Sequence, residues 1–296
     1  MIDKLKKITN NTFELISNEK SQKSLKNINL LLSFFCLLFV TNIFIDYRNE
    51  QNFTFKVYFD EIAIIFISYL ISSSIWANFM KSNYGGSFSN YFYNWSFSKL
   101  GKYIPSGIMT VSVRVNQELP KKQNSKKIFY GLFEEQFIYP LIAIPALFIS
   151  LNLSSNENKL YIFLITLAIS FILFRYIYFK IKPEYISMLD QKFLFLLNLL
   201  IQLVLFYQIA INLNYDEPFT VALYYYLSTS IGLFFIGVPG GIGIRELIFL
   251  TLTNNFLGNI ELINFILKTR LLFIIFDLIF GLIGLIKTTL LNRKTL

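Results

Sequence analysis

Six long apolar runs constrain this chain more than any other feature of its sequence. Each run is close to the roughly 20 residues that an α-helix needs to cross a bilayer. They are residues 28–45, 57–79, 128–151, 160–179, 193–213 and 262–286. Little of the 296-residue chain is left over for a second, soluble domain. The sequence therefore predicts an all-α, polytopic integral membrane protein, with about six spanning helices in a single transmembrane domain over residues 28–296.

The composition agrees with a membrane protein and excludes several kinds of chemistry. Charged residues make up 15% of the chain, against about a quarter in a typical soluble domain. There is no histidine, so mechanisms that need an imidazole base or ligand are excluded. The single cysteine, Cys36, lies in an apolar run, which excludes a disulfide framework and a cysteine metal cluster. We expect no metal, no cofactor and no cleavable signal peptide.

Two further apolar stretches are broken by glycine and proline. In the second, residues 234–246 read Phe-Phe-Ile-Gly-Val-Pro-Gly-Gly-Ile-Gly-Ile-Arg-Glu between apolar flanks. Inside a membrane, backbone leaves helical geometry only where protein buries it or where it lines a wet cavity. We expect one helix to end at the break and another to begin near Ile242, with its free amides and Arg245 attracting an anion. The break residues are Pro239, Gly240, Gly241 and Gly243.

The first broken stretch covers residues 84–120 and is too apolar for a cytoplasmic loop. An aromatic cluster at residues 91–97 comes first, and we interpret it as an interface belt or packing rather than a ligand platform. The break residues Gly101, Pro105 and Gly107 follow, and then Arg114. Lysines flank both ends, so we predict a re-entrant hairpin that enters and leaves on one face. Residues 1–27 are predicted to form a cytoplasmic amphipathic helix or a flexible tail.

Lysine and arginine fall mostly on one side of this layout. They number 6 in residues 1–27, 8 in 81–127, 4 in 175–192 and 3 in 287–296. The predicted outer loops hold only Arg48, Lys56 and Lys159, so the comparison is 21 against 3. By the positive-inside rule both termini are cytoplasmic, and residues 218–257 form a re-entrant element open to the outside. Two broken elements of opposite orientation are typical of inverted-repeat transporters with a site near the midplane.

Ionisable residues inside apolar segments are candidates for function, because a charge at the bilayer centre costs at least about 2.5 kcal/mol. A guanidinium fits phosphate well, so we expect Arg114 and Arg245 to bind an anionic headgroup. The further cations expected there are Lys102 and Arg270. The acids expected to orient these cations or to carry a proton are Glu134, Glu135, Glu246 and Asp277. The alternative is that these charges, together with Lys268, only pair with each other and hold broken helices together.

The acidic pairs Asp60-Glu61 and Asp216-Glu217 are interpreted differently, as solvated ends of spans. The net charge of +9 is interpreted as cytoplasmic-loop lysine, and so no nucleic-acid partner is expected.

Several of these residues together resemble a known family. They are residues 100–107 (Leu-Gly-Lys-Tyr-Ile-Pro-Ser-Gly) with Arg114, the pair Glu135-Gln136, residues 238–246 (Val-Pro-Gly-Gly-Ile-Gly-Ile-Arg-Glu), and Arg270 with Gly281. This pattern is similar to the flippase-like transmembrane domain of the lysylphosphatidylglycerol synthase family. The chain departs from the family at Ser106, where glycine is common, and it ends at Leu296 without the aminoacyl-transferase domain. The resemblance therefore does not imply synthase activity.

What the resemblance implies is a bacterial or archaeal cytoplasmic-membrane protein that translocates a lipid. Its polar core would be Arg114, Glu135, Arg245, Glu246 and Arg270. The substrate would be a phospholipid or a polyprenyl-phosphate-linked sugar, and a glycosyltransferase or another envelope-biosynthesis enzyme would be a partner, with homo-oligomers also expected. Two alternatives stay open. One is a membrane-embedded glycosyl- or phosphotransferase acting on a lipid carrier, and the other is a non-catalytic membrane partner of a glycosyltransferase.

Overall fold

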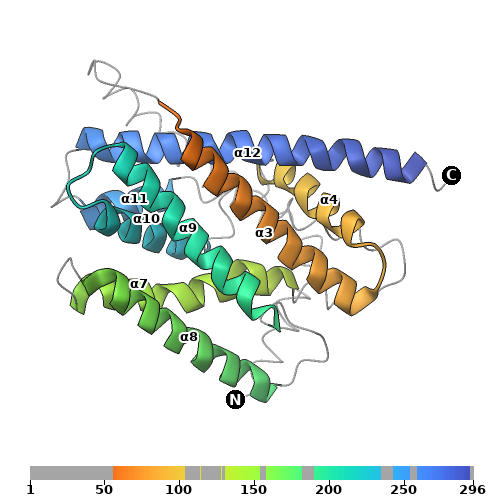
Figure 1. Cartoon of the computed structure of the whole chain (residues 1–296), viewed down its shortest axis with the longest axis horizontal. Helices are drawn as coiled ribbons and strands as arrows, with labels where there is room; N and C mark the ends of the chain where they lie inside the picture. The colour runs from red at the N-terminus through yellow and green to blue at the C-terminus, as the bar shows by residue number, and fades with distance from the viewer. Residues whose placement is uncertain are drawn as a thin grey trace, which may run out of the picture.

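The computed structural model describes residues 56–103, 114, 128, 131–153, 158–181, 190–234, 243–253 and 259–293. Every regular element in these residues is a helix (Figure 1). The all-α class is therefore confirmed for the described part of the chain. The first predicted span, residues 28–45, and the predicted N-terminal segment, residues 1–27, lie outside it.

Within the described part of the chain, five helical segments are long and apolar enough to cross a membrane. They are Phe59–Tyr84, Gly131–Asn152, Lys159–Tyr176, Phe193–Asn212 and Glu261–Thr288. The helices that carry them are α3 (Phe59–Tyr84), α7 (Tyr139–Leu153), α8 (Lys159–Ile181), α9 (Lys192–Asn212) and α12 (Asn259–Arg293). All five coincide with apolar runs of the sequence, which indicates a multi-pass membrane protein.

The helices described in the two broken stretches are all short. The first holds α4 (Phe88–Ser98) and the 3-10 helix η1 (Lys99–Tyr103), and the second holds α10 (Pro218–Gly232) and α11 (Ile244–Thr253). Their α-helices have 11, 15 and 10 residues. At about 1.5 Å per residue, the longest reaches only about 22 Å, less than the roughly 30 Å of a bilayer core. None of these helices can cross a membrane alone.

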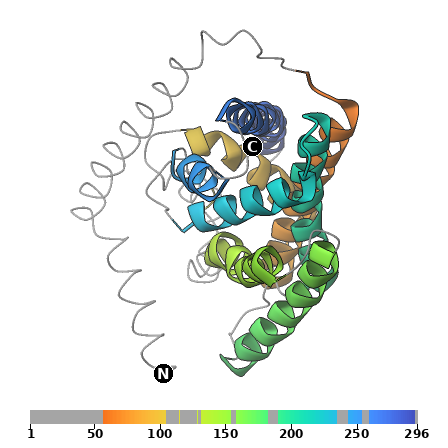
Figure 2. The ribbon, with the colours of Figure 1, turned by 90° about the vertical axis from the view of Figure 1, so that its left-hand side faces the viewer.

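Helix α12 extends across the described part of the molecule, and the short helices lie along its length. Figure 1 shows α10 and α11 beside its N-terminal half and α4 beside its C-terminal half. Helix α10 packs against α9, α11 and α7, and α8 packs on the outer side of α7 (Figure 2). Each of the short helices α4 and α10 therefore lies against two long helices, α3 and α12 for α4, and α7 and α9 for α10.

Glycines permit the close approach of α4 to α12. A Cβ at Gly284 would lie 2.4 Å from the backbone nitrogen of Phe97 and 2.7 Å from the carbonyl oxygen of Tyr93. Any other side chain there would push the two backbones apart. The turn into α4 also depends on glycine, because Gly85 and Gly86 have φ of 70° and 83°.

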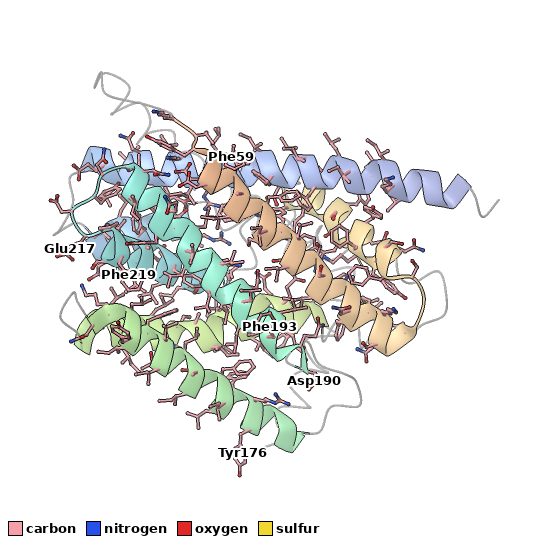
Figure 3. The ribbon with its side chains drawn as sticks, viewed as in Figure 1. Phe59, Tyr176, Asp190, Phe193, Glu217 and Phe219 are labelled. Atoms are coloured by element: carbon pink, nitrogen blue, oxygen red, sulfur yellow. The ribbon has the colours of Figure 1, made fainter. Side chains whose placement is uncertain are left out.

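The outer helices present apolar side chains outward. On α8 the exposed ones are Leu160, Tyr161, Leu164, Ile165, Ile169, Ile172, Leu173 and Tyr176. Figure 3 shows Tyr176 projecting from α8 away from the other helices. An apolar surface of this extent is typical of contact with lipid rather than water.

Two helix ends flank the second break. Helix α10 ends at Gly232, before the predicted break residue Pro239, and α11 begins at Ile244, two residues after Ile242, near which its start was predicted. Gly243 explains the later start, because its φ of 90° lies outside helical geometry.

Candidate functional site

The first broken element leads to the middle of α12. Phe97 lies against Gly284 and the Leu100 side chain against Gly281. Lys102 then forms an ion pair with Asp277, with 2.9 Å between Nζ and Oδ2. The contacts therefore move along α12 from its C-terminal part toward its centre. The middle of the apolar segment Glu261–Thr288 lies between residues 274 and 275, close to Asp277.

In the second broken element, helix α11 begins beside the same central part of α12. At the start of α11, the Glu246 carboxylate forms an ion pair with Arg270 of α12. Its Oε2 also accepts a hydrogen bond of 2.6 Å from the backbone N–H of Gly243, which caps the new helix. Arg270 and Asp277 are seven residues apart on α12, or about 10 Å along its axis. The two elements thus come from opposite ends of α12 and contact it about 10 Å apart, near its middle.

A π-helical turn, η3 (Glu134–Ile138), contacts both elements as well. The Glu135 carboxylate accepts a hydrogen bond of 3.1 Å from Nε1 of Trp95, in α4. The side-chain amide of Gln136 donates one of 3.1 Å to the carbonyl oxygen of Leu233, at the end of α10. π-helical turns inside α-helices are frequent at functional sites. Here the turn presents two neighbouring side chains to two different elements.

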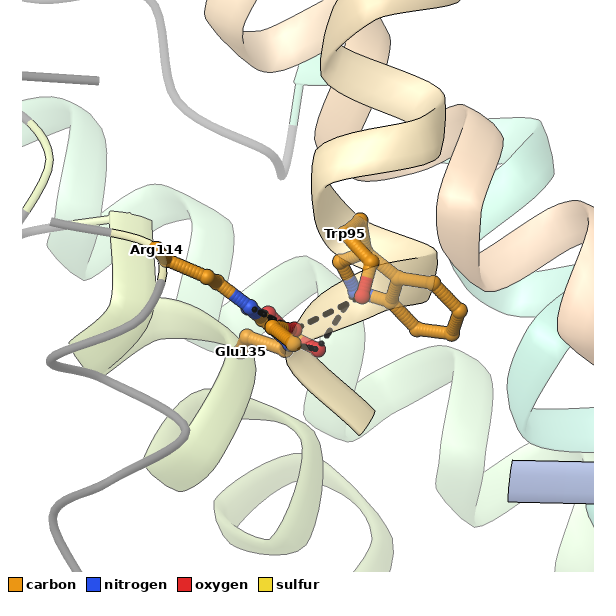
Figure 4. A network of polar contacts seen from close by, with 4 residues as sticks. Trp95, Arg114 and Glu135 are labelled. Atoms are coloured by element: carbon orange, nitrogen blue, oxygen red, sulfur yellow. Dashed lines mark hydrogen bonds and ion pairs between the residues drawn. The ribbon is translucent and has the colours of Figure 1, made fainter. Parts of the chain in front are cut away.

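Arg114 is bound on several sides (Figure 4). Its Nε donates to Oγ of Ser98 at 2.8 Å, and its two terminal nitrogens bind the two carboxylate oxygens of Glu135. The guanidinium carbon also lies 4.7 Å from the ring centroid of Trp76. Arg114 is only 3% exposed. Its donors are therefore directed at protein groups, and it fixes Glu135 in place.

Asp277 is fully buried at the centre of α12. Besides the ion pair with Lys102, its Oδ1 accepts a hydrogen bond of 2.5 Å from the Tyr69 hydroxyl. Tyr69 comes from α3, so this carboxylate joins three elements.

Two cations of the same region have no such partner. Lys99, at the start of η1, forms no hydrogen bond or ion pair with a described residue, and its Nζ lies 3.8 Å from the ring centroid of Trp95. Arg245 packs against Gly232, and its Nε is buried without a hydrogen-bond partner among the described residues. Both side chains are within electrostatic range of Asp277.

We call these groups the central cluster. Its cations are Lys99, Lys102, Arg114, Arg245 and Arg270, and its carboxylates are Glu135, Glu246 and Asp277. Among the described residues, five positive charges face three negative ones, and one positive charge remains even if the neighbouring, buried Glu134 is counted. An unbalanced charge in a low-dielectric interior is costly, so the cluster is suited to receive an anion.

Several residues expected for the site from the sequence are brought together here. They are Lys102, Arg114, Glu135, Arg245, Glu246, Arg270 and Asp277. Gly101 lies buried in η1 next to Lys102, and Glu134 is buried in η3. Pro105, Gly107, Pro239, Gly240 and Gly241 lie outside the described residues.

Sequence reasoning missed Trp95, Lys99 and Tyr69 as members of the site. The sequence pattern places Trp95 in an interface belt or in packing, and it counts Lys99 among the cytoplasmic charges. One signal was available, because Lys99 and Lys102 are three residues apart and share a face at a helix end.

The count of cytoplasmic charges also needs correction. Lys99, Lys102 and Arg114 lie in the central cluster rather than in a cytoplasmic loop. Removing them leaves eighteen lysines and arginines against three, so the direction of the bias does not change.

The interpretation of Glu61 as a solvated end was wrong. Its side chain is fully buried, and its Oε1 lies 2.6 Å from Nζ of Lys268. Asn212 donates a hydrogen bond of 2.8 Å to the same oxygen. Together with Asn212, the ion pair joins α3, α9 and α12. Glu61 is buried because its partner Lys268 lies within the apolar helix α12. Asp216 and Glu217, in contrast, are exposed as expected.

Neither family models, curated proteins nor solved structures match this chain. Among the described residues, no group of three or more acidic or cysteine side chains is arranged to hold a metal ion. The resemblance to the flippase-like domain therefore stays a prediction.

Proposed function

We propose that the protein moves an anionic lipid between the two leaflets of a bacterial or archaeal cytoplasmic membrane. The lipid is a phospholipid or a polyprenyl-phosphate-linked sugar, and the two share a phosphate as the group that is recognised. Its headgroup passes through the central cluster while the acyl or prenyl tail stays in the bilayer. No chemical bond is made or broken. Transfer is downhill or coupled to an ion, with an acid of the cluster or Glu134 carrying a proton.

The observation that carries this proposal is the unbalanced positive charge between the ends of two short helical elements. Half-length helices that enter from opposite faces and end near the midplane are typical of transporter sites. In this proposal the broken stretches are the two re-entrant elements, and residues 28–45 supply a sixth span. Arg245 binds the phosphate, because its Nε has no protein partner among the described residues. Arg114 and Glu135 brace α4 against η3.

The experiment is a leaflet-exchange measurement in proteoliposomes. Fluorescent phosphatidylglycerol, a prenyl-phosphate sugar and zwitterionic phosphatidylcholine are compared for wild type, Arg245→Ala and the control Arg175→Ala. Arg175 lies on the peripheral helix α8, away from the cluster. We expect transfer of an anionic lipid that falls at least about tenfold in Arg245→Ala, since a hydrogen bond to a charged group contributes about 1.5–3 kcal/mol. Arg175→Ala should transfer at the wild-type rate.

The two other functions make different predictions. A membrane-embedded transferase would need a catalytic acid facing a lipid carrier, and would convert that carrier when given a sugar or phosphate donor. A non-catalytic partner of a glycosyltransferase would move no lipid, and Arg245→Ala would still support glycan synthesis in cells. Either result would replace lipid translocation as the function.

A further inference from the structure

We propose that Lys99 is a second anion contact, and that the substrate's anionic group passes between Lys99 on one broken element and Arg245 on the other. This rests on the proposed function and adds to it a residue and a two-position path. Lys99 serves lipid from the leaflet at the α3–α4 turn, and Arg245 serves lipid from the leaflet at the α9–α10 turn.

The ammonium of Lys99 lies against aromatic rings and forms no ion pair with a described residue, and the carboxylate that acts on it most strongly, Glu135, is already bound by Arg114. The Lys99 Nζ lies 3.8 Å from the ring centroid of Trp95, and Tyr69 lies on another side at 5.8 Å. Aromatic faces attract a cation but carry no formal charge, so the positive charge stays available to an anion. Among the described residues, Lys99 is the cation of α4 and η1 that lacks an ion pair, since Lys102 is paired with Asp277.

Trp95 is itself fixed in position. Its side chain is 1% exposed, and Nε1 donates to the Glu135 carboxylate that also binds Arg114. The Arg114–Glu135 pair therefore determines where the Lys99 ammonium lies. Arg114 and Glu135 therefore act on substrate binding indirectly. They position Trp95 and Lys99 and do not contact the substrate themselves.

Arg245 is the cation without an ion pair, among the described residues, in the second broken element, as Lys99 is in the first. It lies in the first turn of α11, and its side chain packs on Gly232 at the end of α10, where a Cβ would lie 2.3 Å from Cγ of Arg245. Its neighbour Glu246 binds Arg270 and the Gly243 amide instead, so Arg245 has no ion pair with a described residue.

The Asp277 carboxylate is the acid that both cations share as an electrostatic neighbour. Its charge acts on both Lys99 and Arg245, while its oxygens bind Lys102 and Tyr69. A phosphate would be repelled by this carboxylate, so it occupies one cation position or the other. Two positions of this kind give a carrier whose apparent affinity depends on the leaflet that supplies the lipid.

The test uses proteoliposomes in which the protein has one orientation, with phosphatidylglycerol diluted in phosphatidylcholine and loaded in either leaflet. The variants are Lys99→Met, Lys99→Arg and Arg245→Gln, with exposed Lys287→Met as the lysine control. For Lys99→Met we expect the half-saturating lipid fraction to rise about tenfold for the leaflet at the α3–α4 turn only. Lys99→Arg restores it, Arg245→Gln shows the effect for the opposite leaflet, and Lys287→Met has no effect.

Two results would overturn the inference. In the first, Lys99→Met changes both leaflets equally. In the second, it lowers the thermal midpoint without changing either half-saturating fraction, as expected of a structural cation on Trp95. If wild type transfers no lipid, the proposed function itself fails. If wild type transfers lipid and the half-saturating fractions of Lys99→Met are unchanged, only the role of Lys99 is rejected, and the proposed function stands.

Discussion

Single residues of the central cluster differ in whether they have a protein partner, and this determines what their replacement does. Arg114 is 3% exposed and directed at Glu135, so removing the carboxylate leaves a buried guanidinium without a counter-ion. Breaking a buried ion pair in this way costs about 3–5 kcal/mol, whereas losing one hydrogen bond costs about 1 kcal/mol.

We therefore expect Glu135→Ala to destabilise the protein by about 3 kcal/mol and Trp95→Phe by about 1 kcal/mol. The first figure is at the lower limit because the Glu135 side chain is 25% exposed. Thermal unfolding in detergent measures both variants. Equal unfolding midpoints for the two variants would mean that the Arg114–Glu135 ion pair does not contribute to the stability of the protein.

The buried pair Glu61–Lys268 allows a double-mutant test at the same scale. Lys268→Met leaves the fully buried Glu61 carboxylate unpaired, and we expect a loss of about 3–5 kcal/mol. Glu61→Gln together with Lys268→Met should recover most of that loss, because neither charge remains. Additive effects of the two substitutions would show that the side chains do not interact.

At the scale of helices, two glycines of α12 with different surroundings face the first broken element, Gly284 against α4 and Gly281 against η1. A Cβ at Gly284 meets backbone atoms of Tyr93 and Phe97, whereas one at Gly281 meets the Leu100 side chain at 2.5 Å. A leucine side chain can turn aside, but a helix backbone must move as a whole.

Gly284→Ala is therefore expected to lower stability and Gly281→Ala to leave it nearly unchanged. Alanine gains about 1 kcal/mol of helix propensity at both sites. Overpacking costs about 1–3 kcal/mol, and we expect that cost to exceed the gain only at Gly284. Gly284→Ala should also slow lipid transfer by displacing Lys102. Unfolding midpoints and leaflet exchange check this, and a greater loss in Gly281→Ala would contradict it.

The sequence was informative about long helices and much less so about the site. Apolar runs predicted all five membrane-length helices, because a span needs about 20 apolar residues and nothing else. It also predicts two breaks, since glycine and proline interrupt helices by local chemistry, but the prolines at both breaks lie outside the described residues. The partners of Glu61 and Trp95 depend on helix packing. Nothing in the local sequence shows that an acid in a first turn faces a lysine 207 positions later.

At the scale of the whole molecule, the account requires that each broken element begins and ends on one face of the membrane. This can be tested in a background in which the single cysteine is removed by Cys36→Ser. Cysteines introduced by Ser87→Cys and Lys122→Cys should react with an impermeant maleimide from the same face. Those introduced by Asp216→Cys and Asn255→Cys should react from the opposite face. Reaction of Ser87→Cys and Lys122→Cys from different faces would show that residues 84–120 cross the membrane.

The central claim is that an anionic headgroup enters the cluster between the two elements, and photo-crosslinking tests it most directly. Wild type and Arg245→Ala are illuminated in vesicles that contain phosphatidylglycerol with a diazirine on its headgroup, and adducts are mapped by mass spectrometry. If the headgroup enters there, adducts form in residues 99–103, 243–250 and 270–277 and decrease in Arg245→Ala. Adducts confined to the exposed apolar surface of α8, and equal in both proteins, would contradict it.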